Sequence, residues 1–162
     1  MSGTAFVRKD VTSTTPGLRG QRIALLRQAR QRLHRQAERA EALRGCAAAA
    51  GHPRLAQALI AIADRAGDLQ EACGDWLRSE GVELAALRDV ELDHAVRSST
   101  RRSDLALAMS IDLRSDDDWV WAIHAEELGW APGSLALLRE IGRSCSLGLV
   151  ALDPFLDSAR RR

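Results

Sequence analysis

Residues 53–79, PRLAQALIAIADRAGDLQEACGDWLRS, decide the fold of this chain. Apolar residues recur there at alternating steps of four and three, the spacing of a helix packed against other helices. Pro53 stands where helices favour proline, and Gly81 follows where they favour glycine. The apolar seam consists of Leu55, Leu59, Ile62, Ala66, Leu69, Cys73 and Trp76. It spans about three heptads, which suits a compact bundle better than a long coiled coil.

The acidic residues of the same segment lie on the other side of the helix. Asp64, Asp68, Glu71 and Asp75 recur at i, i+4, i+7 and i+11, so they share one face. At about 100° per residue, that face lies nearly opposite the apolar seam. If the seam faces the core, these carboxylates face water.

The preceding part of the chain predicts a tail and one more helix. Residues 1–18 are polar and without periodicity, so we expect a disordered tail followed by one helical domain over 19–162. Apolar residues at steps of three and four predict a helix from Leu18 to Leu43. The small residues of 45–51 then form a connection.

The segment that follows residue 81 has weaker periodicity. Residues 82–113 read either as one helix with a frayed centre or as two shorter helices, because 97–103 are polar on every side. Ser115 and Asp116–Asp118 are typical of a helix start, since they offer a cap and three acids to the positive end of the dipole. A further helix spans 135–152, and Asp153-Pro154 predicts the start of a short terminal helix.

Composition supports an all-α domain. The chain has 162 residues, 46% hydrophobic, which is enough for one core, while strand-favouring aromatic residues make up only 4%. The 23 basic and 22 acidic residues nearly cancel, so no global field draws the protein to nucleic acid or acidic lipid. The fold expected is an antiparallel four-helix bundle with extra short helices.

Three cysteines and the N-terminal sequence indicate a cytoplasmic protein. An odd number of widely spaced cysteines, Cys46, Cys73 and Cys145, predicts reduced thiols. The first residues carry no apolar signal-peptide run, and no stretch is long enough to cross a bilayer. Cys73 and Cys145 fall on helix seams, so we expect small core residues whose thiol pKa is not lowered.

A four-helix bundle raises the question of a di-metal carboxylate site. Such a site needs two Glu-x-x-His motifs on different helices, and this chain offers a single match, Glu91 to His94. We therefore favour no metal. If iron or manganese does bind, the candidate ligands are Glu71, Glu91, His94, Glu126 and Glu127.

Glu126 is the one acid that a helical projection at about 100° per residue places on an apolar face, together with Trp119, Ile123 and Trp130. A buried carboxylate is costly unless it is paired or protonated. It is either a ligand or a binding group, or else a carboxylate that pairs with an arginine or lies at the rim near the end of a short helix. We favour the latter two readings over a ligand or binding group.

Catalytic motifs are missing from the sequence. There is no nucleophile elbow, phosphate-binding glycine loop or dinucleotide fingerprint. We assign no catalytic residue and favour a protein that is not an enzyme.

The first helix is rich in arginine. Residues 19–44 contain eight Arg and two Glu, whereas residues 54–83 contain three Arg and six acids. Such a helix can neutralise phosphates, which makes nucleic acid an alternative partner, through Arg27, Arg30, Arg35 and Arg39. No aromatic residue lies among them to stack on bases, and an acidic neighbour or a second copy is an equally natural partner.

The tryptophans indicate a protein interface instead. Val120 and Trp121 lie off the helical seam, which predicts an exposed apolar face. We expect self-association, as a homodimer, or binding of another protein. The candidate interface residues are Trp119, Trp121 and Trp130.

The order of these elements resembles an uncharacterised bacterial ferritin-like four-helix-bundle family. The resemblance covers residues 22–81 best, and it is carried by 25–29, 35–37, 52–55, 63–65 and 69–71, then by 116–118 and 125–128. It implies a possible di-metal centre, with Glu71 and Glu127 nearest to the family's acids. Because the second Glu-x-x-His motif is absent, the resemblance implies a copy that has lost the metal and kept the scaffold.

Overall fold

The described residues of the chain are almost entirely helical. A computed structural model describes residues 7–91, 93–125 and 128–160. Within these ranges there is no β-strand. The helices are α1 (Val7–Ala49), α2 (Pro53–Ser79), α3 (His94–Ser98), α4 (Arg102–Ala125) and α5 (Pro132–Arg160). The all-α prediction is confirmed.

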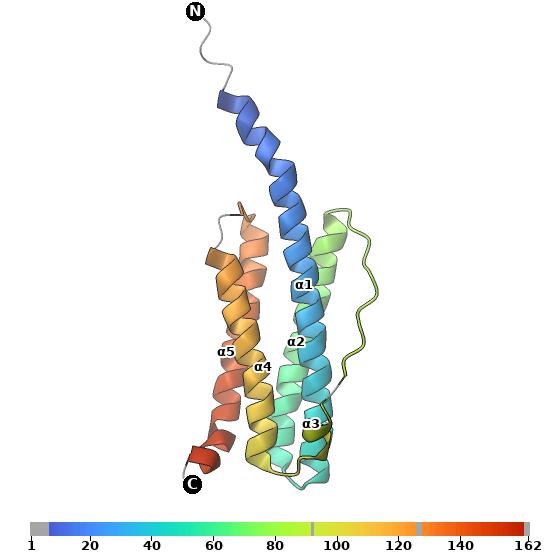
Figure 1. The fold of residues 1–162 in the computed structure, drawn as a ribbon, viewed down its shortest axis with the longest axis vertical. Coiled ribbons are helices and arrows are strands. Elements are labelled where there is room, and N and C mark those ends of the chain that lie inside the picture. Colours follow the sequence, from blue (N-terminus) through green and yellow to red (C-terminus); the bar gives the residue numbers. More distant parts are fainter. Residues whose placement is uncertain (1–6, 92, 126–127, 161–162) are drawn as a thin grey trace, which may run out of the picture.

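The four long helices form an antiparallel bundle (Figure 1). α1 packs against α2 and α4, and α5 packs against α4 and α2. Each of these neighbouring pairs runs antiparallel (Figure 1). One long connection, residues 80–101, returns along the bundle from the end of α2 to the start of α4 and includes α3. Among the described helices, none combines the length and hydrophobicity needed to cross a lipid bilayer.

α1 is longer than the sequence predicted at both of its ends. It begins at Val7, inside the segment expected to be a tail, and its first turns project beyond the other helices (Figure 1). It also continues past Leu43 to Ala49, since Ala47 is fully buried against the neighbouring helices. The chain reverses at Gly51, whose φ of 78° favours glycine.

The second half of the chain differs more from the prediction. Residues 82–91 form no helix, and α4 begins at Arg102, so the predicted helix start at Ser115 is wrong. α5 runs without interruption through Pro154, so the predicted separate terminal helix is wrong as well. Proline removes the hydrogen bond to the carbonyl four residues earlier, at Val150. Val150 is exposed, so water can satisfy that carbonyl.

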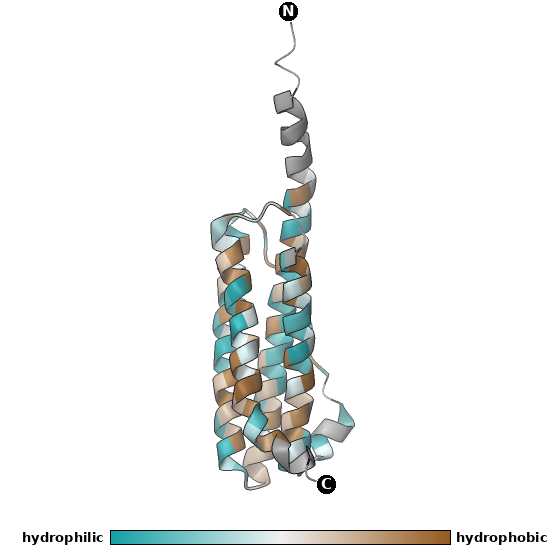
Figure 2. Cartoon of the chain, turned by 90° about the vertical axis from the view of Figure 1, so that its left-hand side faces the viewer, coloured by the Kyte–Doolittle hydropathy of each residue, from teal (hydrophilic) through white to brown (hydrophobic). Residues whose placement is uncertain are grey.

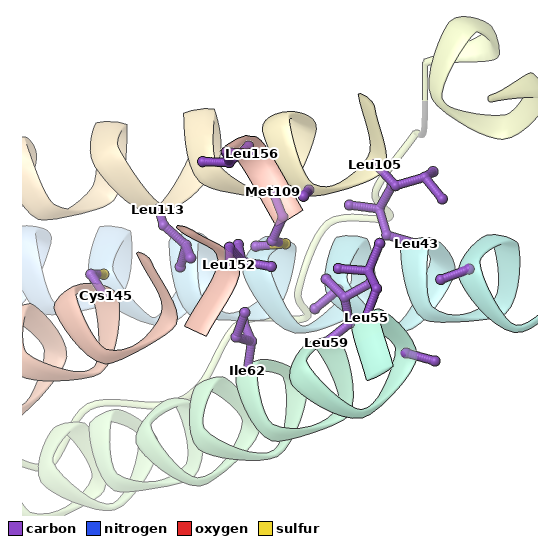
Figure 3. Close-up of a cluster of buried hydrophobic side chains, with 14 residues drawn as sticks. Leu43, Leu55, Leu59, Ile62, Leu105, Met109, Leu113, Cys145, Leu152 and Leu156 are labelled. Carbon is purple, nitrogen blue, oxygen red and sulfur yellow. The ribbon is translucent and has the colours of Figure 1, made fainter. Parts of the chain in front are cut away.

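The core consists of two hydrophobic clusters stacked along the bundle. One surrounds Leu43, Leu59 and Met109 (Figure 3), and the other surrounds Leu26 and Leu138. α2 contributes to both clusters, and its predicted seam faces inward. Its seam residues Leu55, Leu59, Ile62, Ala66 and Cys73 are buried, Leu69 and Trp76 are half-buried, and Asp64, Asp68, Glu71 and Asp75 are exposed.

Candidate functional site

A buried polar layer separates the two hydrophobic clusters. Gln36 of α1, Asp116 of α4 and Ser144 of α5 are all buried, and each lies between the two clusters in the order of its helix. Buried polar groups are costly unless they are hydrogen-bonded. The partners of Asp116 therefore decide what this layer does.

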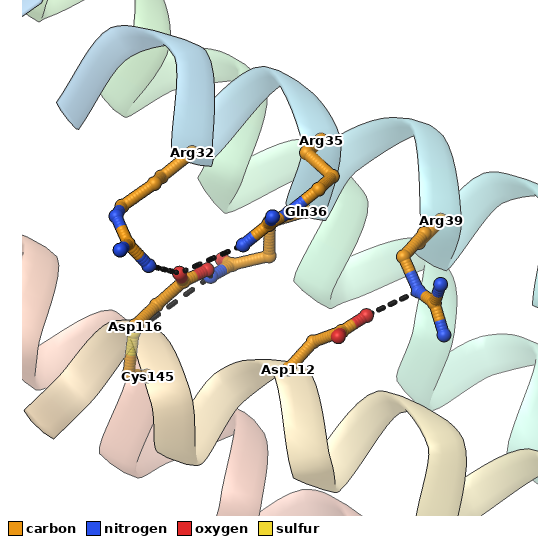
Figure 4. A network of polar contacts seen from close by, with 7 residues as sticks. All are labelled: Arg32, Arg35, Gln36, Arg39, Asp112, Asp116 and Cys145. Atoms are coloured by element: carbon orange, nitrogen blue, oxygen red, sulfur yellow. Dashed lines mark hydrogen bonds and ion pairs between the residues drawn. The ribbon is translucent and has the colours of Figure 1, made fainter. Parts of the chain in front are cut away.

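Asp116 is held by three side chains of α1 (Figure 4). Arg32 Nη1 donates to Oδ1 at 2.9 Å, and Gln36 Nε2 donates to Oδ2 at 3.0 Å. Arg35 Nη2 lies 3.5 Å from Oδ1. The carboxylate is only 3% exposed. The predicted place of Asp116 in the first turn of a helix is thus wrong: α4 starts earlier, at Arg102, and the acid points into the bundle.

A second ion pair lies one helical turn away. Arg39 of α1 pairs with Asp112 of α4, and both side chains are largely buried. Burial raises the pKa of Asp112, while the charges of Arg39 and Arg35 act in the opposite direction. Charge-assisted hydrogen bonds are among the stronger polar contacts. The two pairs fasten α4 to α1 in one register.

Most of the arginines proposed to bind nucleic acid contact other residues of the same chain. Arg35 and Arg39 bind the carboxylates of α4. Arg30 Nη1 donates to the Ala85 carbonyl at 2.9 Å and so holds the connection between α2 and α4. Arg27 is exposed and has no such contact within the described part of the chain. The positive charge of α1 is thus largely committed to its own bundle.

The candidate metal ligands do not come together in the described structure. Glu71, Glu91 and His94 are exposed, and Glu126 and Glu127 lie outside the described residues. Within residues 7–91, 93–125 and 128–160, no three His, Cys, Asp or Glu side chains are grouped as a metal site requires. The arginine pair proposed for Glu126 likewise lies outside those residues.

The two seam thiols are not activated. Cys73 and Cys145 are fully buried, and burial raises the pKa of each to about 12. Since a reactive cysteine needs a lowered pKa, both behave as small core residues. The prediction for these two residues is confirmed.

The three interface tryptophans have different surroundings. Trp121 is 59% exposed, as predicted, but its neighbour Val120 is 2% exposed, so the prediction for Val120 is wrong. Trp119 is half-buried, with the guanidinium carbon of Arg32 4.7 Å from its ring centroid. Trp130 is buried in the cluster around Leu26. Only Trp121 is freely available on the surface.

Most of the exposed large apolar side chains belong to α4 and α5, the helices on the side of the bundle that Figure 2 turns toward the viewer. Six large hydrophobic side chains are exposed among those described, and five of them belong to these two helices. Large apolar side chains gathered on one side of a protein are typical of binding surfaces. We define the α4–α5 face by Leu107, Ile111, Trp121 and Val150. Leu147 also lies on α5, while Ile60 lies on α2.

Comparison with known proteins adds no relative. The chain has no significant match among protein-family models, curated proteins or solved structures. The ferritin-like resemblance therefore stays a prediction. The candidate functional regions are the two features described above, the buried polar layer and the exposed α4–α5 face.

Proposed function

We propose that this chain is a non-catalytic helical-bundle protein that associates with a second copy of itself through the α4–α5 face. The observation that carries the proposal is the exposure of Leu107, Ile111, Trp121 and Val150 on one side of the bundle. Tryptophan is enriched among the residues that dominate binding energy at interfaces. Burying this face against another protein removes apolar surface from water.

Charge on the same helix favours a second copy as the partner. Arg114 and Asp118 are both exposed on α4, four residues apart, among the apolar residues of the face. A two-fold axis brings the same patch of both subunits together. With the two α4 helices antiparallel, Arg114 of each copy can face Asp118 of the other.

A ferritin-like origin fits this proposal. Ferritin-like bundles have one long crossover connection, and residues 80–101 are such a connection. The carboxylate at the centre of the bundle, Asp116, is bound by Arg32 and Gln36 rather than left open. Both features support a scaffold that has lost its metal.

Sedimentation velocity tests the proposed association. The wild-type chain should sediment as a dimer at micromolar concentration, and Trp121→Ala or Ile111→Arg should shift it toward monomer. Ile60→Arg, on the exposed side of α2, is the matched control and should leave the dimer intact. A wild-type monomer, or a dimer unaffected by both face variants, contradicts the proposal.

Elemental analysis tests the competing di-iron or di-manganese hypothesis. Protein from cells grown with both metals should contain neither in stoichiometric amount. A stoichiometric metal would overturn the non-catalytic proposal. The nucleic-acid alternative instead requires a salt-dependent mobility shift of DNA or RNA.

A further inference from the structure

A hollow of about 250 Å³ lies between α4 and α5 on the α4–α5 face. Its floor is apolar, because Val120 and Leu138 are buried beneath it. Gly142 opens it from the α5 side. A Cβ atom placed on Gly142 would have Asp117 Oδ1 and Val120 Cγ1 as its nearest neighbours, both at 3.7 Å, which is ordinary contact. The hollow therefore exists because residue 142 lacks a side chain, and a larger residue could fill it.

Two aromatic rings line the α4 side of the hollow. Trp121 and His124 have ring centroids 5.8 Å apart and planes tilted by 45°. Nε2 of His124 is buried and has no hydrogen-bond partner within the described part of the chain.

The α5 side of the hollow is positively charged. Arg139 and Arg143 line it together with Ser146, and among the described residues no carboxylate does. Arg143 makes one exposed contact, 3.7 Å from Glu140, which is too weak to neutralise it. Arg139 has no ion-pair partner among the described residues. Asp117 also lies close to Gly142, and its pKa is raised by burial and by the charge of Asp118.

We propose that this groove binds a small organic anion with a flat apolar body, such as an aromatic carboxylate. The ring would lie over Val120 and Leu138 against Trp121, where apolar and aromatic contacts favour it. The carboxylate would accept hydrogen bonds from Arg139 and Arg143, since guanidinium groups match carboxylate geometry. Ser146 would supply a further polar contact.

This site needs only one copy of the chain. Both helices that form the groove belong to the same bundle, so ligand binding goes beyond the proposed self-association and does not depend on it. Because Trp121 belongs both to the groove and to the α4–α5 face, self-association would compete with the ligand, so binding is also measured on the Ile111→Arg variant, which should be monomeric.

Titration with 3-phenylpropionate, followed by NMR of the tryptophan indole N–H groups, tests the inference. Of the four tryptophans in the chain, Trp121 should give the largest shift, and Trp121→Phe identifies its signal. The double variant Arg139→Gln/Arg143→Gln should weaken binding at least about tenfold, because charge-assisted hydrogen bonds are lost. The uncharged analogue 3-phenyl-1-propanol should bind about tenfold more weakly for the same reason.

Gly142→Leu should abolish binding by filling the hollow. Gly67→Leu is the matched control, because Gly67 of α2 also lies within a helix and has open space around it. It should leave binding unchanged. If Gly142→Leu does not fold by circular dichroism, the exposed arginine variants decide the question alone.

Three results would overturn the inference: no indole shift up to about 10 mM ligand, equal affinity for the carboxylate and the alcohol, or unchanged binding by the arginine double variant. Sedimentation of the same samples separates this inference from the proposed function. A monomeric Ile111→Arg variant that does not bind rejects only the ligand site, and a wild-type monomer that binds rejects only the self-association.

Discussion

α2 and α4 belong to the same bundle but distribute their residues in opposite ways. α2 buries an apolar seam and exposes its acids. α4 buries Asp116 against α1 and exposes Leu107, Ile111 and Trp121. The difference shows that burial depends on the available partners as well as on polarity. The carboxylate is inside because α1 supplies its donors, and the apolar residues are outside because none of the described helices covers them.

The largest expected effect comes from the seam of α2. Leu59→Ala removes a fully buried side chain from the cluster around Leu43 and should lower the free energy of unfolding by about 2–5 kcal/mol. Ile60→Ala, at a neighbouring position that is 38% exposed, should cost less than about 1 kcal/mol. Urea denaturation followed by circular dichroism measures both, and equal losses would contradict the assignment of the seam.

The buried acid of α4 should come next. Asp116→Ala leaves Arg32, Arg35 and Gln36 without their acceptor and should lower the free energy of unfolding by about 2–3 kcal/mol. This loss is smaller than for a fully buried ion pair because both arginines reach solvent. Asp64→Ala, on the exposed face of α2, should cost less than about 0.5 kcal/mol. Urea denaturation measures both variants. Similar losses of unfolding free energy would contradict the claim that α4 buries its acid while α2 exposes its own.

The seam thiols predict a loss of stability at alkaline pH. Burial raises the pKa of Cys73 and Cys145 from an ordinary value of 9.0 to about 12. Their contribution is fully present below pH 9 and is lost as the pH rises toward 12, because only the unfolded chain releases these protons. Each thiol should lower the free energy of unfolding by about 1.4 kcal/mol per pH unit in that window.

Denaturation at several pH values measures this slope. Cys73→Ala and Cys145→Ala should each make the profile less steep, by about half of the thiol-dependent slope. If the pH profile of each variant is as steep as that of the wild-type chain, the two thiols are not shielded from solvent.

The smallest effect on stability is expected on the outer side of α4. Ile111→Gln replaces an exposed residue and should change the free energy of unfolding of the monomer by less than about 0.5 kcal/mol. The same change should weaken self-association. Denaturation of one preparation measures the stability of the monomer, and sedimentation of the same preparation measures self-association. A large loss of monomer stability would mean that Ile111 packs inside the bundle.

The sequence was informative where local pattern and tertiary environment agree. The 4-3 spacing of Leu55, Leu59 and Ile62 required only a neighbouring apolar surface, which any bundle provides. The thiols of Cys73 and Cys145 were correctly read as inert because seam positions are buried. These inferences depend on one helix at a time.

The sequence was misleading where a residue's role depends on a distant segment. Asp116 was read as a helix start, although it binds Arg32 and Arg35 of α1. A complementary spacing could have linked them: Asp112 and Asp116 stand four apart, and Arg35 and Arg39 also stand four apart. Matching charge patterns between helices would have suggested the contact.

By itself the sequence determined an all-α bundle, the inward face of α2 and the inertness of two thiols, because periodicity and burial are properties of a single amphipathic helix. Only the tertiary structure decided which helices are neighbours, and therefore which charges are neutralised, which tryptophan stays exposed, and where a hollow opens beside Gly142. The physical reason is that these features arise between helices. An ion pair or a groove needs two surfaces, and the pattern along one segment describes only one of them.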